Sequence, residues 1–141
     1  MPVLNRLTDS LSRRLPKILD SDAHQAADYL MSGCFFASGA WFLLRKNRRA
    51  GLSALICGGS TLGLNLLTYY PGESRRPIPF ELHGRIETGL AAMVATMPEF
   101  LRFEKDREKS FFLLAAGALT LISNLSSFRP QTRNRNARKA G

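Results

Sequence analysis

Two long stretches of this 141-residue chain carry no charged side chain, and they constrain the fold more than any other feature. Residues 50–70 offer 21 uncharged positions and residues 110–128 offer 19, where a membrane-spanning helix needs about 20 mostly apolar residues. Residues 29–44 and 88–98 form two shorter apolar segments. A chain of this length cannot surround four such helices with protein, so we predict that lipid surrounds them.

Small residues recur four apart within these segments, as in Gly59 and Gly63. In lipid, where the hydrophobic effect no longer drives helix association, such positions let backbones approach closely. The predicted helix-packing residues are Gly33, Ala37, Gly58, Gly59, Gly63 and Gly117.

The charged residues flank the apolar segments. The chain has 20 Lys and Arg against 11 acidic residues, a net charge of +9, which favours an anionic partner. Because the bases border apolar segments, anionic lipid headgroups fit better than nucleic acid. Residues 1–21 place leucines on one helical face and are predicted to form an amphipathic interfacial helix, with packing on the rest of the protein as the alternative. Residues 129–141 are predicted to form a basic disordered tail.

The chain also repeats itself. Residues 22–69 align with residues 81–128 at an offset of 59 without a gap, and nine of the 48 pairs are identical. We therefore predict an all-α, integral membrane four-helix bundle over residues 22–128, made of two tandem two-helix repeats, 22–70 and 81–128. Two helices return each repeat to its starting side, so both repeats share one orientation and both chain ends lie on one side.

A short motif opens the second repeat: His83, Gly84 and Glu87, preceded by Tyr70-Pro71 and Ile78-Pro79-Phe80. With the tandem hairpins, it resembles the SPW-repeat family of small bacterial inner-membrane proteins, over about residues 24–128. That family carries Ser-Pro-Trp late in the first helix of each unit, where this chain has residues 38–41 and 97–100. The resemblance implies the two-hairpin architecture and a bacterial inner membrane, but no established activity.

Six polar residues are predicted to converge at one end of the bundle. In each repeat a histidine stands four residues before an acid, on one helix face, and an asparagine lies near the end of the second helix. These residues are His24, Asp28, Asn65, His83, Glu87 and Asn124. Three interpretations compete: a structural clasp of hydrogen bonds, a proton or small-solute site, and a metal site. The clasp is favoured and no metal or cofactor is predicted, because nothing in the sequence brings the two His/acid pairs within ligand reach.

No catalytic constellation is recognisable, so we predict no enzyme. The sequence predicts a small integral membrane protein of structural or interaction type, such as an accessory subunit of a membrane complex. The alternative is a minimal transporter or channel that uses the polar cluster. Besides the bilayer and its anionic headgroups, the predicted partner is another protein or a second copy of the chain. Of the 20 Lys and Arg residues, 12 fall on the side of the chain ends, which places both termini in the cytoplasm by the positive-inside rule.

Overall fold

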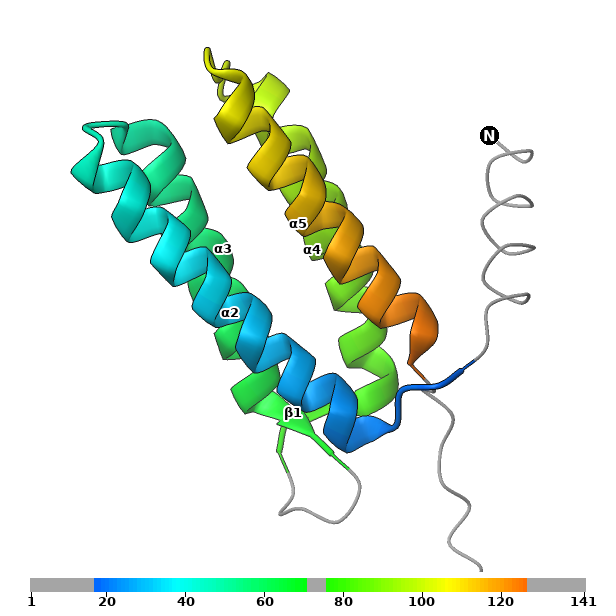
Figure 1. Ribbon diagram of the computed structural model, residues 1–141. Helices are drawn as coiled ribbons and strands as arrows, with labels where there is room; N and C mark the ends of the chain where they lie inside the picture. The colour runs from blue at the N-terminus through cyan, green and yellow to red at the C-terminus, as the bar shows by residue number, and fades with distance from the viewer. Residues whose placement is uncertain (1–16, 71–75, 127–141) are drawn as a thin grey trace, which may run out of the picture.

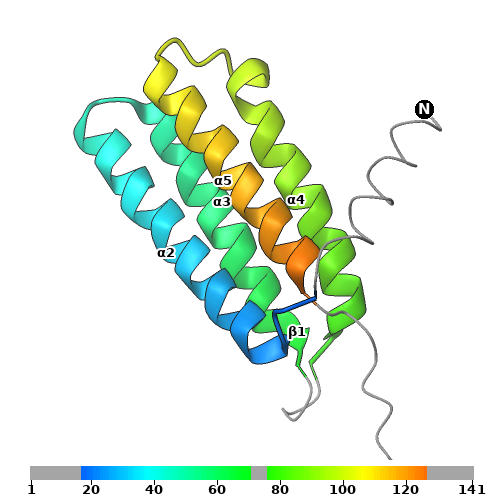
Figure 2. The ribbon, with the colours of Figure 1, turned by 45° about the vertical axis from the view of Figure 1, so that its right-hand side comes forward.

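The computed structural model describes residues 17–70 and 76–126. They form four helices, α2 (Ser21–Leu44), α3 (Arg48–Leu67), α4 (Phe80–Phe100) and α5 (Asp106–Leu125), which run side by side as a bundle (Figure 1; Figure 2). The predicted all-α fold with four helices is therefore confirmed. The predicted amphipathic helix over residues 1–21 falls almost entirely outside the described residues, and the predicted tail over residues 129–141 lies wholly outside them.

The four helices pair as two hairpins, α2 with α3 and α4 with α5. Helix α2 begins after Asp20, whose carboxylate accepts a hydrogen bond from the Ala23 amide at 2.8 Å, and Asn47 caps α3 in the same way through the Ala50 amide. The turns that end α2 and α4 place Lys46 and Arg102 at positive φ, 61° and 50°. Both hairpin loops lie at the same end of the bundle (Figure 1), so the two repeats run in the same direction.

The opposite end is joined by short parallel backbone pairings that the sequence analysis did not predict. Strand β1 (Thr68–Tyr69) pairs with β2 (Ile78–Pro79), and Leu19 bridges Ser126, with the Leu19 amide donating to the Leu125 carbonyl at 3.0 Å. Each pairing joins the residue that leads into one repeat to the residue that ends the other. The two hairpins are thus tied to each other reciprocally at this end.

The alignment of the two repeats without a gap is wrong by one residue in the second helices. Helices α3 and α5 are both 20 residues long, and they begin at Arg48 and Asp106, which is an offset of 58. Burial agrees, because Gly58 and Ala116 are buried whereas Gly117, the partner of Gly58 at offset 59, is exposed. The offset of 59 holds in the first helices, where the histidines and acids of both repeats are buried.

The predicted helix-packing positions are mostly not contacts between the described helices. A Cβ added at Gly33, Gly59, Gly63 or Gly117 would meet no described atom within 4 Å, and Ala37 is exposed. Gly58 does lie against α2, where its added Cβ would stand 3.1 Å from the Cβ of Phe35. The prediction failed because a four-residue spacing fixes one face of a helix but does not say which neighbour that face meets.

A close approach between α2 and α3 at two facing glycines was not predicted. An added Cβ at Gly39 would lie 3.1 Å from the Gly51 carbonyl oxygen, and one at Gly51 would lie 3.1 Å from the Gly39 carbonyl oxygen. Only glycine lets the two backbones come this near without displacing a neighbour.

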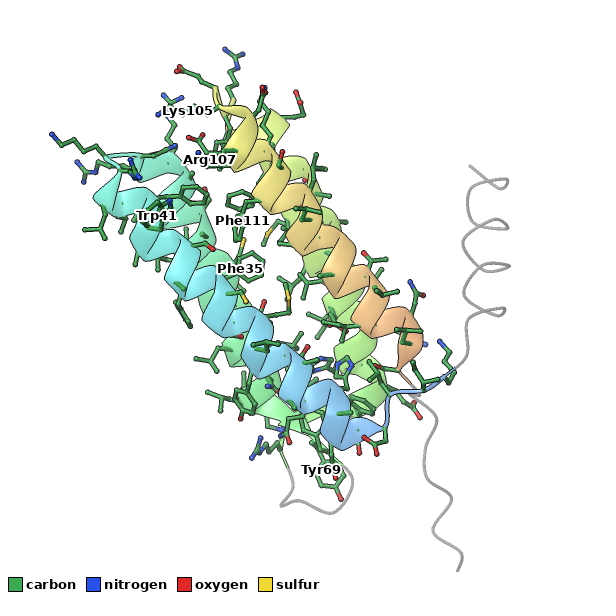
Figure 3. The ribbon with its side chains drawn as sticks, in the orientation of Figure 1. Phe35, Trp41, Tyr69, Lys105, Arg107 and Phe111 are labelled. Carbon is green, nitrogen blue, oxygen red and sulfur yellow. The ribbon has the colours of Figure 1, made fainter. Side chains whose placement is uncertain are left out.

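Apolar side chains fill the middle of the bundle and also cover its outside. Phe35 of α2 and Phe111 of α5 point toward each other between the hairpins (Figure 3), with ring centroids 5.9 Å apart. On the outer surface Leu44 is 80% exposed and Phe100 is 85% exposed. Further exposed apolar residues on all four helices are Leu30, Leu52, Ile56, Leu82, Ile86, Leu113 and Leu114.

One described helix, α3, is long and apolar enough by composition to cross a membrane. Four spanning helices were predicted. Helices α2 and α4 contain the ionisable residues Asp28 and Glu87, which lower their hydropathy although both side chains are buried inside the bundle. Helix α5 begins with four charged residues, which lie at the end of the bundle with the hairpin loops.

Candidate functional site

Four of the six predicted polar residues meet between the hairpins. His24 and Asp28 come from the first turns of α2, and His83 and Glu87 from the first turns of α4. Each is at most 2% exposed, and one nitrogen or oxygen atom from each lies within 4.8 Å of those of the other three. We call these four residues the polar centre. It lies near the starts of α2 and α4, at the end of the bundle away from the hairpin loops.

Most contacts within the polar centre join residues of different repeats, and one joins two residues of the first repeat. The Nε2 atoms of His24 and His83 are 3.1 Å apart. Asp28 Oδ2 lies 3.0 Å from Nε2 of His83 and 3.4 Å from Nε2 of His24. Glu87 Oε2 lies 3.6 Å from Nε2 of His24. The geometry therefore differs from a clasp across each single hairpin, because it joins one hairpin to the other.

The other ring nitrogen of each histidine is held by a hydroxyl group. His24 Nδ1 lies 2.6 Å from the Ser126 hydroxyl, and His83 Nδ1 lies 2.7 Å from the Thr68 hydroxyl. Each hydroxyl has a single hydrogen, which it donates to a backbone carbonyl four residues earlier, at 2.6 Å for Ser126 and 2.5 Å for Thr68. In that arrangement each hydroxyl oxygen can accept from Nδ1–H of its histidine.

The Nδ1–H tautomer of both neutral imidazoles is compatible with this hydrogen bonding. With the proton on Nδ1, each Nε2 carries a lone pair, and both lone pairs face the middle of the polar centre. Asp28 and Glu87 add carboxylate oxygens to the same small volume. Four electron-pair donors thus converge in this tautomer.

The two carboxylates are poorly satisfied for groups buried so deeply. None of their four oxygens receives a hydrogen bond of good geometry from the described residues, although the Ser123 hydroxyl of α5 lies beside Glu87. A buried carboxylate without partners costs several kcal/mol, on the order of the penalty for burying any uncompensated charge. The polar centre therefore needs a proton or a cation to offset its two carboxylates.

Aromatic rings cover the polar centre at the end of the bundle. The ring centroid of Phe80 lies 5.3 Å from that of His24, and the ring of Tyr70 lies 5.2 Å from Phe80 and 6.0 Å from His83. Both aromatic side chains are buried. This apolar cover separates the polar centre from the surroundings and strengthens every electrostatic interaction within it.

The two predicted asparagines behave differently. Asn65 is buried, donates to the Gln25 carbonyl at 3.3 Å and accepts from the Tyr70 hydroxyl at 2.6 Å. Asn65 therefore holds Tyr70, one of the aromatic residues that cover the polar centre, in place. Asn124 is half-buried, and its side-chain amide donates to the Thr120 carbonyl of its own helix at 2.9 Å. At the offset of 58, the counterpart of Asn65 is Ser123.

Sequence reasoning missed the two hydroxyls that orient the histidines. Thr68 and Ser126 are the first residues after α3 and α5, and both are buried. The sequence signal is a hydroxyl residue at the same place after the second helix of each repeat. It was hidden because the two residues are 58 apart and the repeats had been aligned at 59.

The opposite end of the bundle is strongly basic. A cavity of about 400 Å³ lies between the two hairpin loops. Its basic lining consists of Arg45, Lys46, Arg48, Arg49, Arg102 and Lys105. Beneath these bases the buried Glu108 accepts a hydrogen bond from Asn47, linking the second hairpin to the first.

Comparison with protein-family models, with curated proteins and with solved structures gave no match. The resemblance to the SPW-repeat family therefore stays a prediction, and the function is argued from the geometry alone.

Proposed function

We propose that this chain is an integral membrane protein of structural or interaction type, in which two parallel hairpins are joined from within by the polar centre. The observation that carries the proposal is the distribution of polarity. Large apolar side chains cover the outside of all four helices, while His24, Asp28, His83 and Glu87 are buried inside. A soluble monomer rarely exposes so many large apolar side chains, and its ionisable residues are rarely buried. Lipid as the surrounding solvent accounts for both features.

The charge distribution suggests how the bundle sits in a bilayer. The basic cavity and the charged start of α5 lie at one end. Leu19 and Ser126, near the two ends of the described residues, pair at the other end. The uncharged middle of the helices lies between these ends. We propose that the bases around the cavity contact anionic headgroups, and that both termini face the cytoplasm of a bacterial inner membrane.

A role as an accessory subunit fits these features better than a transporter or channel. The ionisable residues of the polar centre are at most 2% exposed, and Tyr70 and Phe80 cover them. A transport site must open to water on each side in turn, whereas this centre joins the two repeats. The partner we propose is another membrane protein, or a second copy of the chain, packed against the exposed apolar faces.

Alkaline carbonate extraction tests the proposal. Membranes from cells that express the full chain are washed at high pH and separated into pellet and supernatant. We expect the protein in the pellet, with a known integral protein as the positive control and a peripheral protein as the negative control. Release of most of the protein into the supernatant would refute membrane integration.

A further inference from the structure

The geometry points to a binding site for one divalent transition-metal ion of the zinc type in the polar centre. Its ligands are His24 Nε2, His83 Nε2 and one carboxylate oxygen each from Asp28 and Glu87. Each hairpin supplies one imidazole and one carboxylate, so the site is complete only when the two repeats are docked. The sequence placed this interpretation last, because it could not show that the two pairs lie within reach of a common ion.

The distances between the ligand atoms fit a tetrahedral ion. Zinc–nitrogen and zinc–oxygen bonds of about 2.0–2.1 Å at tetrahedral angles place ligand atoms about 3.3 Å apart. The observed separations are 3.0 and 3.4 Å from Asp28 to the two imidazoles, 3.1 Å between the imidazoles, and 3.6 Å from Glu87 to His24. One nitrogen or oxygen atom from each of the four residues lies within 4.8 Å of those of the other three.

The charges of the ligands match a divalent ion. Two carboxylates and two neutral imidazoles around M²⁺ give a site with no net charge, which suits an interior where an unpaired charge is costly. The same ion would satisfy one oxygen of each carboxylate, and no hydrogen bond of good geometry reaches these oxygens among the described residues. Calcium and magnesium fit poorly, because they prefer all-oxygen spheres of six or more ligands.

The hydroxyl groups that contact the two histidines also support a metal site. A metal-ligating histidine usually donates its other N–H to an oxygen acceptor, which fixes the tautomer and aims the lone pair at the metal. Ser126 and Thr68 take this position behind His24 and His83, at 2.6 and 2.7 Å. The arrangement occurs twice, with the hydroxyl that orients each histidine supplied by the other repeat.

A clasp held only by protons explains less of this geometry. If both imidazoles were protonated, two N–H groups and two positive charges would face each other with their Nε2 atoms 3.1 Å apart. If a single proton were shared between the imidazoles, a second proton on Glu87 would be needed to neutralise the other carboxylate. One metal ion offsets both carboxylates and uses both lone pairs.

Equilibrium dialysis of the purified full-length chain against Zn²⁺ tests the site. The protein is isolated in detergent with an affinity tag that contains no histidine and is then stripped with a chelator. His24 and His83 are the only two histidines of the chain, so histidine background is absent. We expect one zinc per chain, and Co²⁺ in its place should give the intense visible absorption of a tetrahedral ion.

The same substitutions at proposed ligands and at exposed acidic residues show which carboxylates bind the ion. Asp28→Asn and Glu87→Gln keep the size of the side chain and should weaken Zn²⁺ binding by about 100-fold or more. Asp22→Asn and Glu81→Gln make the same changes at exposed positions in the first turns of the same helices and should leave binding unchanged. Thr68→Val removes the acceptor behind His83 and should weaken binding by about 10- to 100-fold. Circular dichroism and size-exclusion chromatography verify that each variant is folded.

Two results would overturn the site. The first is less than about 0.1 zinc per chain in the folded wild-type protein at saturating Zn²⁺. The second is equal zinc affinity of the wild type and of folded Asp28→Asn and Glu87→Gln proteins. Neither result bears on the carbonate extraction, because zinc binding depends on the docked repeats and not on the bilayer, so the two proposals can fail separately.

Discussion

Replacing Gly39 with alanine probes the close approach between α2 and α3. The added Cβ would lie 2.8 and 2.9 Å from two carbons of the Leu55 side chain and 3.1 Å from the Gly51 carbonyl oxygen. Leu55 can turn aside, but the Gly51 carbonyl belongs to the backbone of α3, so the helices must separate slightly. Overpacking of this kind costs about 1–3 kcal/mol. Alanine returns about 1 kcal/mol through its higher helix propensity, so we expect a free energy of unfolding that is unchanged or lower by up to about 2 kcal/mol.

Gly33→Ala is the matched control for this prediction. It lies in the same helix, and its added Cβ meets no described atom within 4 Å, so it keeps the propensity gain without the clash. The propensity terms cancel between the two variants, and Gly39→Ala should be less stable than Gly33→Ala by about 1–3 kcal/mol. Unfolding by sodium dodecyl sulfate in mixed micelles, followed by circular dichroism, measures this difference. Equal stabilities would show that α2 and α3 are not in contact at Gly39.

Three further predictions follow from the site and the topology. Asn65→Leu should destabilise the protein by about 1–2 kcal/mol, because it removes two buried hydrogen bonds, whereas Asn124→Leu should change stability by less than about 0.5 kcal/mol; equal effects in micelle unfolding would refute the distinction. Reporter fusions at Gly72 and Gly141 should both report cytoplasm and one at Lys46 the opposite side, and a split between the first two would contradict parallel hairpins. Zinc at 100 times its dissociation constant should raise the free energy of unfolding by about 2.7 kcal/mol, and an unchanged unfolding curve would contradict binding to the folded state.

The helices and the residues of the polar centre could be predicted from the sequence for the same reason. Uncharged segments and a histidine four residues before an acid are local patterns. Such patterns involve residues close together in the chain, so they can be recognised without knowing the fold. His24, Asp28, His83 and Glu87 could therefore be named in advance as a group. Their mutual distances could not, because these depend on how two hairpins dock across residues far apart in the chain.

The errors in the helix-packing residues and in the repeat alignment have one physical origin. The sequence does not show how each helix is rotated about its axis relative to its neighbour. A spacing of four residues marks Gly59 and Gly63 as one face of α3, yet that face meets no described helix, and the close contact falls instead at Gly39 and Gly51. The offset between the repeats is another example. At an offset of 59 the counterpart of Asn65 is Asn124, whereas at the offset of 58 that the second helices have it is Ser123. One residue turns a helix face by about 100°, so a one-residue error exchanges a buried position for an exposed one.

The central claim is that lipid surrounds the outer face of the helices, and the reactivity of Cys34 tests it most directly. Cys34 lies in the middle of α2 and is exposed on the bundle, whereas Cys57 is buried. In a Cys57→Ala background, opened membranes are treated with a charged, water-soluble maleimide, which needs water and a thiolate to react. Lys46→Cys in the hairpin loop, placed in a chain without Cys34, serves as the aqueous control.

The account predicts that the cysteine at position 46 is labelled rapidly in native membranes. Cys34 should remain unlabelled there and react only after the membrane and the fold are dissolved in sodium dodecyl sulfate. Labelling of Cys34 in native membranes at the rate of the loop cysteine would contradict the account, because it would place the apolar outer face of α2 in water.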